Sequence, residues 1–300
     1  MQKNTLSPAR KLVESAIMLA IATVLSLLKL IDLPYGGSVT VASMLPIIII
    51  SYRHNVKWGL LTGLAFGIIQ QLLGLKTLSW VTTWQSILAV ILLDYIIAFA
   101  VAGLGGVFRK ITSQPKALLL GALLVGILRY LCHVISGATV WAGLSIPTNA
   151  ALIYSLGYNA TYMIPETIVT MIVGYYIGSV LDFRRENVTR LRREENAAFP
   201  ILKFAAGLVI VCALVAVTVL VFGQIQNAET GEFDITGLKN VNWPLTGIIA
   251  AAAGFYAATL LIIETEITRL RSELSAIRSK YDKLAEQSGS PEEKEVKEKN

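Results

Sequence analysis

Polar and aromatic side chains recur inside stretches of this chain that are otherwise strongly apolar. They fall into three groups: Asp94 with Tyr95, then His133, Gly137 and Trp141 at four-residue steps, then Tyr154 and Asn159. An ionisable group at the centre of a bilayer costs about 2.5–3.5 kcal/mol on insertion scales, and it usually faces a cavity or the protein interior. This inventory of a carboxylate, an imidazole, an amide and aromatic rings favours a pocket for a small, flat solute that can be a cation.

The second group defines one face of a helix, because residues four apart lie above one another. His133, Gly137 and Trp141 share this face, and Arg129 extends it by one turn. Gly137 would leave space beside the indole of Trp141 for a flat ligand. A histidine in an apolar run is often a packing residue, but its aromatic and acidic companions favour a ligand contact for His133.

Asp94 has two interpretations that both stay open. It can be the counter-ion of a cationic ligand, strengthened by the low dielectric of its surroundings. It can also form a buried ion pair with Arg129. Glu166, directly after Pro165, is a second candidate partner for Arg129. We therefore expect Arg129 and Glu166 behind the residues that touch the ligand.

Tyr95 and Tyr154 offer ring faces that attract a cation by about 0.5–2 kcal/mol, and Asn159 offers both a donor and an acceptor. No catalytic residue, metal ion or cofactor is expected, because the sequence holds no HExxH, CxxC or nucleophile-elbow pattern. The sequence also lacks a G-x-x-x-x-G-K-S/T loop for ATP phosphates. A binding protein is favoured over an enzyme, in which Asp94 and His133 would form an acid–base pair.

The composition is that of a polytopic membrane protein. Of 300 residues, 54% are hydrophobic and only 15% are charged, whereas soluble domains contain about 25% charged residues. No cleaved signal peptide is expected at the N-terminus. The two cysteines, Cys132 and Cys212, lie in apolar runs and form no disulfide framework. The class of protein that we expect is all-α and membrane-embedded.

Eight helices are expected at about 12–31, 39–51, 57–75, 83–107, 116–138, 150–182, 201–223 and 246–265. With the N-terminus inside, the outer loops contain only Lys76 and Lys239 as basic residues. The inner segments hold many more: Lys3, Arg10, Lys11, Arg53, Lys57, Arg109, Lys110, Lys116, the Arg184–Arg193 cluster, Lys203 and the basic C-terminal tail. The positive-inside rule then places both termini in the cytoplasm of a bacterial cell membrane. Because the charge follows this topology, nucleic-acid binding is not expected.

Five regions are expected along the chain. Residues 1–182 form a six-helix block, and its second helix, which contains Pro46, is brief enough to be kinked or to span incompletely. Glycines four residues apart, at 59, 63 and 67 and again at 174 and 178, indicate close helix packing. A hydrophilic linker, expected to be helical, occupies 183–200. A two-helix membrane hairpin spans 201–265, a coiled coil spans 266–288, and 289–300 is a charged, disordered tail.

The coiled coil is predicted from a seam of apolar residues that alternates steps of four and three: Ile263, Ile267, Leu270, Leu274, Ile277, Tyr281 and Leu284. This is a heptad pattern, and it indicates self-association or docking near another protein. A single amphipathic helix on the bilayer surface is the alternative.

The first 182 residues resemble a known family, the thiamine-specific substrate-binding S-components of energy-coupling-factor vitamin transporters. The resemblance covers about residues 10–182. It is carried by ESAIMLAIATVLS (14–26), YGGSVTVASMLPIIIISYRHNVKWG (35–59), LLDYIIAFAVAGLGGVFRK (92–110), RYLCHVISGATVW (129–141) and YSLGYN (154–159). The combination of H-x3-G-x3-W with a later Y-x4-N is its most specific part.

The resemblance implies a six-helix bundle that binds thiamine near its outer face, under the loop between the first two helices. It places Asp94 and Tyr95 at the ligand, His133, Tyr154 and Asn159 in hydrogen-bonding positions, and Trp141 against a ligand ring. Ala16 and Ala20 match the small-residue stripe that docks on a transmembrane coupling subunit, which acts with two cytoplasmic ATPases.

The sequence departs from the family at two places. Asp94 stands where the family more often has Glu, and Gly36-Gly37 occupy a loop in which a tryptophan is expected. Another flat heterocyclic vitamin or a thiamine precursor is therefore an alternative ligand. An alternative of another class is a membrane sensor or scaffold that acts through its coiled coil.

Overall fold

The computed structural model describes residues 7–33, 37–142, 148–149, 151–191, 201–225 and 234–288. The fold is mostly helical, as expected, and six of the described helices are long and apolar enough to cross a membrane. They are Val56–Leu73, Trp84–Lys110, Gln114–Thr139, Ala151–Val180, Ile201–Ile225 and Trp243–Leu284. Four of these six lie within the first 182 residues. The first two expected helices are not among them.

The connection between the first two helices differs from the prediction. Helix α1 (Pro8–Leu27) ends earlier than expected, and β1 (Lys29–Asp32) follows it. Strand β2 (Ser38–Thr40) pairs antiparallel with β1, where helix had been expected from residue 39. Helix α2 (Leu45–Arg53) therefore has only nine residues, too few to span a bilayer core. The expectation that this helix spans incompletely is consistent with its length.

Two long rods follow. Helix α3 (Val56–Leu73) starts at Asn55, whose side chain accepts a hydrogen bond from the Trp58 amide and caps the first turn. A 3-10 turn, η2 (Leu75–Trp80), leads to the second rod, the helical stretch 84–110, which consists of four consecutive helical pieces. They are α4 (Trp84–Val90), the π-helical η3 (Ile91–Ile97), α5 (Ala98–Ala100) and the 3-10 helix η4 (Val101–Lys110).

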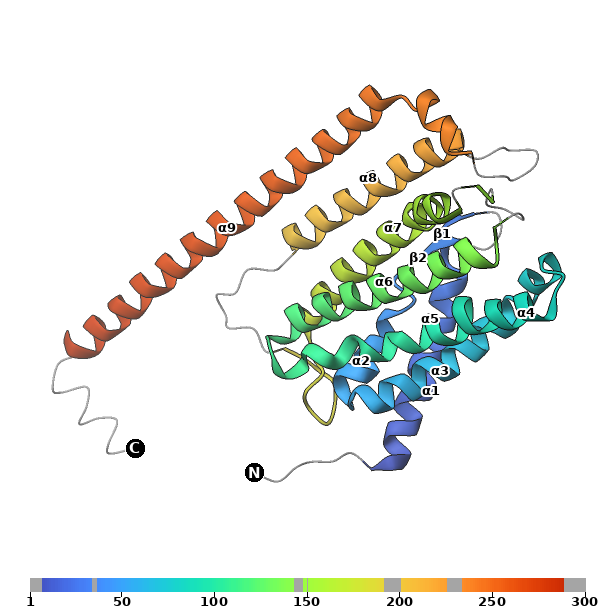
Figure 1. The fold of residues 1–300 in the computed structure, drawn as a ribbon. Coiled ribbons are helices and arrows are strands. Elements are labelled where there is room, and N and C mark those ends of the chain that lie inside the picture. The colour runs from blue at the N-terminus through green and yellow to red at the C-terminus, as the bar shows by residue number, and fades with distance from the viewer. Residues whose placement is uncertain are drawn as a thin grey trace.

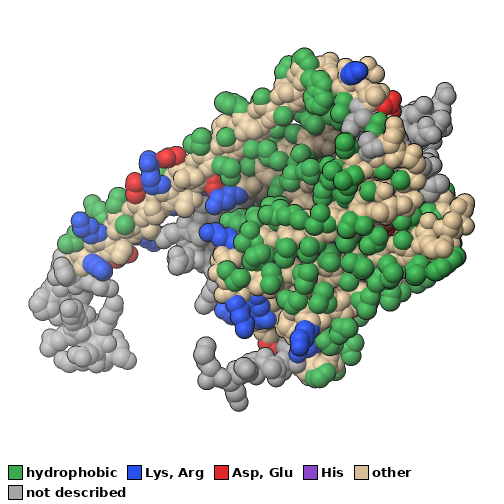
Figure 2. All heavy atoms as spheres, in the orientation of Figure 1, with side chains coloured by type: hydrophobic (Ala, Val, Ile, Leu, Met, Phe, Trp, Pro, Cys, Tyr) green, Lys and Arg blue, Asp and Glu red, His purple; other side chains and the backbone are tan. Residues whose placement is uncertain are grey.

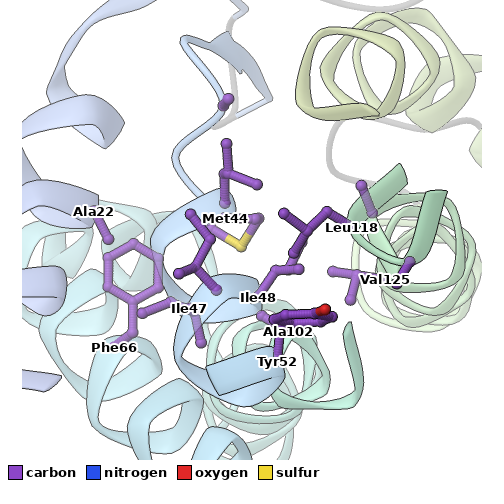
Figure 3. Close-up of a cluster of buried hydrophobic side chains, with 14 of the residues drawn as sticks. Ala22, Met44, Ile47, Ile48, Tyr52, Phe66, Ala102, Leu118 and Val125 are labelled. Carbon is purple, nitrogen blue, oxygen red and sulfur yellow. The ribbon is translucent and has the colours of Figure 1, made fainter. Parts of the chain in front are cut away.

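Helices α6 (Gln114–Thr139) and α7 (Ala151–Val180) lie side by side over most of their length (Figure 1). Helix α7 continues through Pro165. The short helix α2 lies between these two helices and the rods, and its side chains fill the centre of the bundle. Figure 3 shows Ile47, Ile48 and Tyr52 of α2 among side chains of the surrounding helices, including Phe66 and Leu118.

The glycine stripe of α3 confirms the packing interpretation. A Cβ atom at Gly63 would lie 2.8 Å from the carbonyl oxygens of Phe99 and Ala100, and one at Gly59 would lie 2.9 Å from the Gly103 oxygen. On the other rod, a Cβ at Gly103 would lie 2.2 Å from the Leu60 nitrogen. The two rods therefore touch backbone to backbone, which only glycine allows.

We expect Gly103→Ala to lower the thermal unfolding temperature of the protein in detergent. The clash involves backbone atoms that cannot rotate away, and overpacking of this kind costs about 1–3 kcal/mol. Gly254→Ala is the matched control, because a Cβ there meets nothing within 4 Å. Equal unfolding temperatures for the two variants would contradict this account of the helix crossing.

The linker after α7 also differs from the prediction. Strand β3 (Leu181–Asp182) turns back and pairs antiparallel with β4 (Thr189–Arg190), so residues 183–191 are not helical. The reason is a set of specific partners: the Gln114 side chain accepts from the Phe183 amide at 3.0 Å, and Arg53 donates to the carbonyl oxygens of Phe183 and Arg185. Residues 192–200 lie outside the described part.

Helix α8 (Ile201–Ile225) packs along α7 and α9 (Trp243–Ser288), and η5 (Ile235–Asn240) precedes α9. The second hairpin helix and the predicted coiled-coil segment are one continuous helix of 46 residues.

Figure 2 shows a broad hydrophobic face over the bundle, with Lys and Arg gathered at one end of it and along the far half of α9. The predicted tail from 289 to 300 lies outside the described residues, as does Gly36.

Candidate solute-binding cavity

A cavity of about 270 Å³ lies inside the first 182 residues. The β1–β2 hairpin contributes Lys29, Gly37, Ser38 and Thr40 to its wall. Most of the other lining residues come from α3, the 84–110 rod, α6 and α7, with a few from the end of α1 and the turn η2. Most of the predicted ligand residues line it: Asp94, Tyr95, Arg129, His133, Gly137, Trp141, Asn159 and Glu166. Residues from separate stretches of sequence are thus brought to one partly open cavity.

Asp94 is the centre of a hydrogen-bond cluster. Its Oδ2 accepts from Ser136 Oγ at 2.6 Å and from Trp141 Nε1 at 3.1 Å, and its Oδ1 lies 3.0 Å from His133 Nδ1. Asp94 sits on the π-helical stretch η3, a widened geometry that is frequent at functional sites. These partners fix the orientation of the carboxylate in the cavity wall.

The face predicted on α6 is present. His133 and Gly137 line the cavity on this helix, and Trp141 follows just past its end. The indole of Trp141 is buried and meets the Trp80 ring edge to face, with ring centroids 6.1 Å apart. Because the indole N–H already binds Asp94, the ring is held in one orientation.

Helix α7, which packs along α6, supplies the adjoining part of the wall. Asn159 Nδ2 donates to the carbonyl oxygens of His133 at 3.2 Å and Ser155 at 2.9 Å, and its Oδ1 accepts from the Tyr162 hydroxyl at 2.6 Å. Tyr154 is not among the lining residues of the described chain. It packs against the cluster around Trp141, and its contact with a ligand stays a prediction.

Arg129 and Glu166 are buried and also line the cavity. The described chain shows no ion pair within 4.0 Å for Arg129, so neither Asp94 nor Glu166 pairs with it directly. Its guanidinium instead lies 4.8 Å from the centroid of the Phe99 ring. Glu166 accepts from the Thr40 amide at 2.5 Å and from Thr40 Oγ1 at 2.7 Å, which ties the β1–β2 hairpin to α7.

Tyr95 lies on the α3 side, where its hydroxyl is 2.9 Å from Thr77 Oγ1. Several polar residues of the cavity were not predicted from the sequence: the lining residues Thr40, Gln70, Thr77, Tyr158 and Tyr162, and Ser136, which binds Asp94. Ser136 stands three residues after His133 and Tyr162 three after Asn159, so helical spacing alone could have found these two. Thr40 could not be found in this way, since it comes from the unexpected hairpin.

These features define a multi-pass membrane protein with a polar cavity lined by its helices. The family model of the thiamine transporter protein family (Thia_YuaJ) matches residues 12–182, and the chain belongs to that family. The thiamine transporter ThiT of Bacillus subtilis (strain 168) is 39% identical over 175 residues, which are 54% of this chain and 87% of that protein. Every residue named in the cavity wall falls inside the matched range.

A solved structure of ThiT from Listeria monocytogenes aligns with 57% of this chain and 93% of its own, at 23% sequence identity and a TM-score of 0.47. Helices α8 and α9 lie beyond the residues that the family model matches.

Proposed function

We propose that this protein is the thiamine-binding subunit of an ATP-driven energy-coupling-factor importer. Membership of the thiamine transporter protein family supports the substrate, and the cavity around Asp94 is the observation that carries the proposal. Thiamine joins a flat aminopyrimidine to a thiazolium ring with a permanent positive charge. Its volume is of the same order as the cavity, which is near the lower end of the roughly 300–1,000 Å³ typical of ligand pockets.

The residues of the cavity suit these two rings. Asp94 supplies the negative charge that a cation needs in a site of low dielectric. The ring of Trp141 provides a stacking surface, and Tyr95 provides an edge with a hydroxyl. His133, Tyr154 and Asn159 orient the ligand through hydrogen bonds. The hairpin between α1 and α2 covers the site and would move when the ligand enters.

The chain needs partners for energy, because its sequence contains no ATP-binding loop. We propose a transmembrane coupling subunit and two cytoplasmic ATPase subunits. Ala16 and Ala20 lie on an exposed face of α1 beside Leu12 and Ile17, which are 61% and 55% exposed. Small residues between apolar ones allow a partner helix in the membrane to approach closely. Both termini would be cytoplasmic, in agreement with the basic end of the bundle in Figure 2.

Thiamine titration of the purified protein, followed by tryptophan fluorescence, tests the proposed substrate. We expect saturable quenching at nanomolar thiamine, because a ligand ring stacked on Trp141 changes the emission of that indole. Trp141→Ala should remove the signal and weaken binding. Trp243→Phe, a change at an exposed residue of α9, is the control that should keep the thiamine-dependent signal.

A flat titration with intact protein would argue against thiamine. The same assay with other flat heterocyclic vitamins and with thiamine precursors would then identify the ligand. If none of them quenches the fluorescence while the protein remains folded by circular dichroism, the cavity is not the substrate site of an importer.

A further inference from the structure

Helix α9 is much longer than a bilayer requires. It runs for 46 residues from Trp243 to Ser288, which is about 69 Å at 1.5 Å per residue. The hydrocarbon core of a bilayer is about 30 Å thick and accommodates about 20 helical residues. With the exposed Trp243 at one membrane surface, the helix leaves the other surface near Ile263. Figure 1 shows α9 extending far past the start of α8.

The projecting segment carries the predicted apolar seam, and the described chain leaves this seam uncovered. Six of its side chains are 43–71% exposed, at positions 263, 270, 274, 277, 281 and 284. Together with the half-buried Ile267 they form the α9 seam. In heptad notation, positions a are Ile267, Leu274 and Tyr281, and positions d are Ile263, Leu270, Ile277 and Leu284.

The charges that flank the α9 seam have a definite order. Positions g are Glu266, Glu273 and Lys280, and positions e are Glu264, Arg271, Arg278 and Ala285. In a parallel coiled coil, each g residue faces the e residue five positions further along the other helix. Glu266 of one copy would then face Arg271 of the other, and Glu273 would face Arg278, so both contacts join opposite charges. Lys280 would face the uncharged Ala285, so no like charges meet.

An antiparallel pair of the same helices would not have this uniform pattern. In that arrangement g faces g and e faces e, so like charges would meet at Glu273 and Arg271, while Lys280 and Glu264 would meet opposite charges. Within one chain, Arg269 already pairs with Glu266 at 2.8 Å and Glu273 at 3.7 Å. Arg271 and Arg278, in contrast, have no ion pair within 4.0 Å among the described residues. Surface pairs within one helix contribute little, so they do not prevent the glutamates from also facing a second copy.

The shape of α9 argues against the alternative that the α9 seam lies on the membrane surface. No Gly or Pro occurs between residues 255 and 288, and the helix is unbroken through the expected membrane boundary. It therefore continues along its own axis into water, where it cannot lie flat on the bilayer. The seam is also a narrow a/d stripe, which fits a coiled coil better than the broader apolar face of a surface helix.

We infer that two copies of this chain associate through a parallel coiled coil formed by residues 263–284. Two copies in one membrane have the same orientation, so their projecting helices run in the parallel direction that the charges favour. The association places two solute-binding domains in one particle. It does not depend on the identity of the solute.

The full-length protein in detergent tests this inference by light scattering coupled to size-exclusion chromatography. We expect a protein mass of two copies of the 32.6 kDa chain. The double variant E266R/E273R makes the four facing positions 266, 271, 273 and 278 basic, and R271E/R278E makes these four positions acidic. Each variant alone should be monomeric through repulsion. Co-expressed with different tags, the two variants should purify together as a heterodimer, because every facing pair is again opposite in charge.

A wild-type mass of one, three or four copies would overturn the inference. A dimer that persists in either charge variant, or a failure of the two variants to associate with each other, would overturn it as well. Circular dichroism of each variant checks that the helices are retained, so that loss of the dimer is not loss of the fold.

Disulfide crosslinking tests the parallel register. In a chain with Cys132 and Cys212 replaced by alanine, Leu274→Cys places one thiol at position a, where the two copies of a residue meet in a parallel dimer. With copper-phenanthroline as the oxidant, two such thiols should form one disulfide. Two protons are released and two electrons pass to the oxidant. Ser272→Cys on the outer face is the matched control and should not crosslink. Equal crosslinking at both positions would contradict the parallel arrangement.

Discussion

Replacing Asp94 with Asn is expected to weaken thiamine binding by more than tenfold. The substitution keeps the size of the side chain and removes its negative charge from the cavity wall, where the attraction to a cation is stronger than in water. It also replaces an oxygen by an NH2 group. Both Asp94 oxygens now face polar partners: Ser136 Oγ and Trp141 Nε1 donate to one, and His133 Nδ1 lies near the other. An amide must turn its NH2 group toward one of these sides.

Asp282→Asn is the matched control, since Asp282 is an exposed carboxylate on α9, outside the cavity. It should bind thiamine with the wild-type dissociation constant. Isothermal titration calorimetry on both variants gives the comparison. An unchanged dissociation constant for Asp94→Asn would remove Asp94 from the proposed ligand contacts, and Glu166, the other carboxylate in the cavity wall, would become the candidate counter-ion.

Many residues of the cavity could be predicted from the sequence, because polar and ionisable side chains have a high free-energy cost inside a membrane. His133, Gly137 and Trp141 are brought into register by helical spacing, and Asp94 stands out as a carboxylate in an apolar run. All four line the cavity. The direct partners of Asp94 were harder to predict. The expected alternative was Arg129, but the structure places His133, Ser136 and Trp141 at the carboxylate.

The β elements could not be predicted from periodicity. Residues 29–40 contain a short strand pair stabilised by tertiary contacts, above all the bonds from Thr40 to Glu166 on α7. The segment after α7 has helix-forming residues such as Arg185 and Glu186, yet it is held in an extended hairpin by Arg53 and Gln114. In both places a few long-range hydrogen bonds override local propensity.

Arg53 carries the second large expected effect, on the stability of the fold. Its side chain is 3% exposed and binds both oxygens of Glu14, at 2.6 and 2.9 Å, which links α2 to α1. It also donates to the backbone carbonyls of Phe183, Arg185 and Glu186, which links both helices to the β3–β4 connection. One planar guanidinium thus joins three segments, a task for which lysine lacks the donors.

We expect Arg53→Met to destabilise the protein by about 3 kcal/mol, the lower end of the cost of breaking a buried ion pair, because Arg10 remains 3.2 Å from Glu14. Arg53→Lys should recover only part of the loss, and Arg190→Met, at an exposed residue of β4, should have little effect. Thermal unfolding in detergent measures all three. If Arg53→Met unfolds at the same temperature as the wild type, the guanidinium does not hold these segments together.

Since α1 carries the proposed docking face at Ala16 and Ala20, a folded Arg53→Met protein should lose more thiamine uptake than thiamine binding. The binding cavity lies away from Arg53 and is lined by other residues.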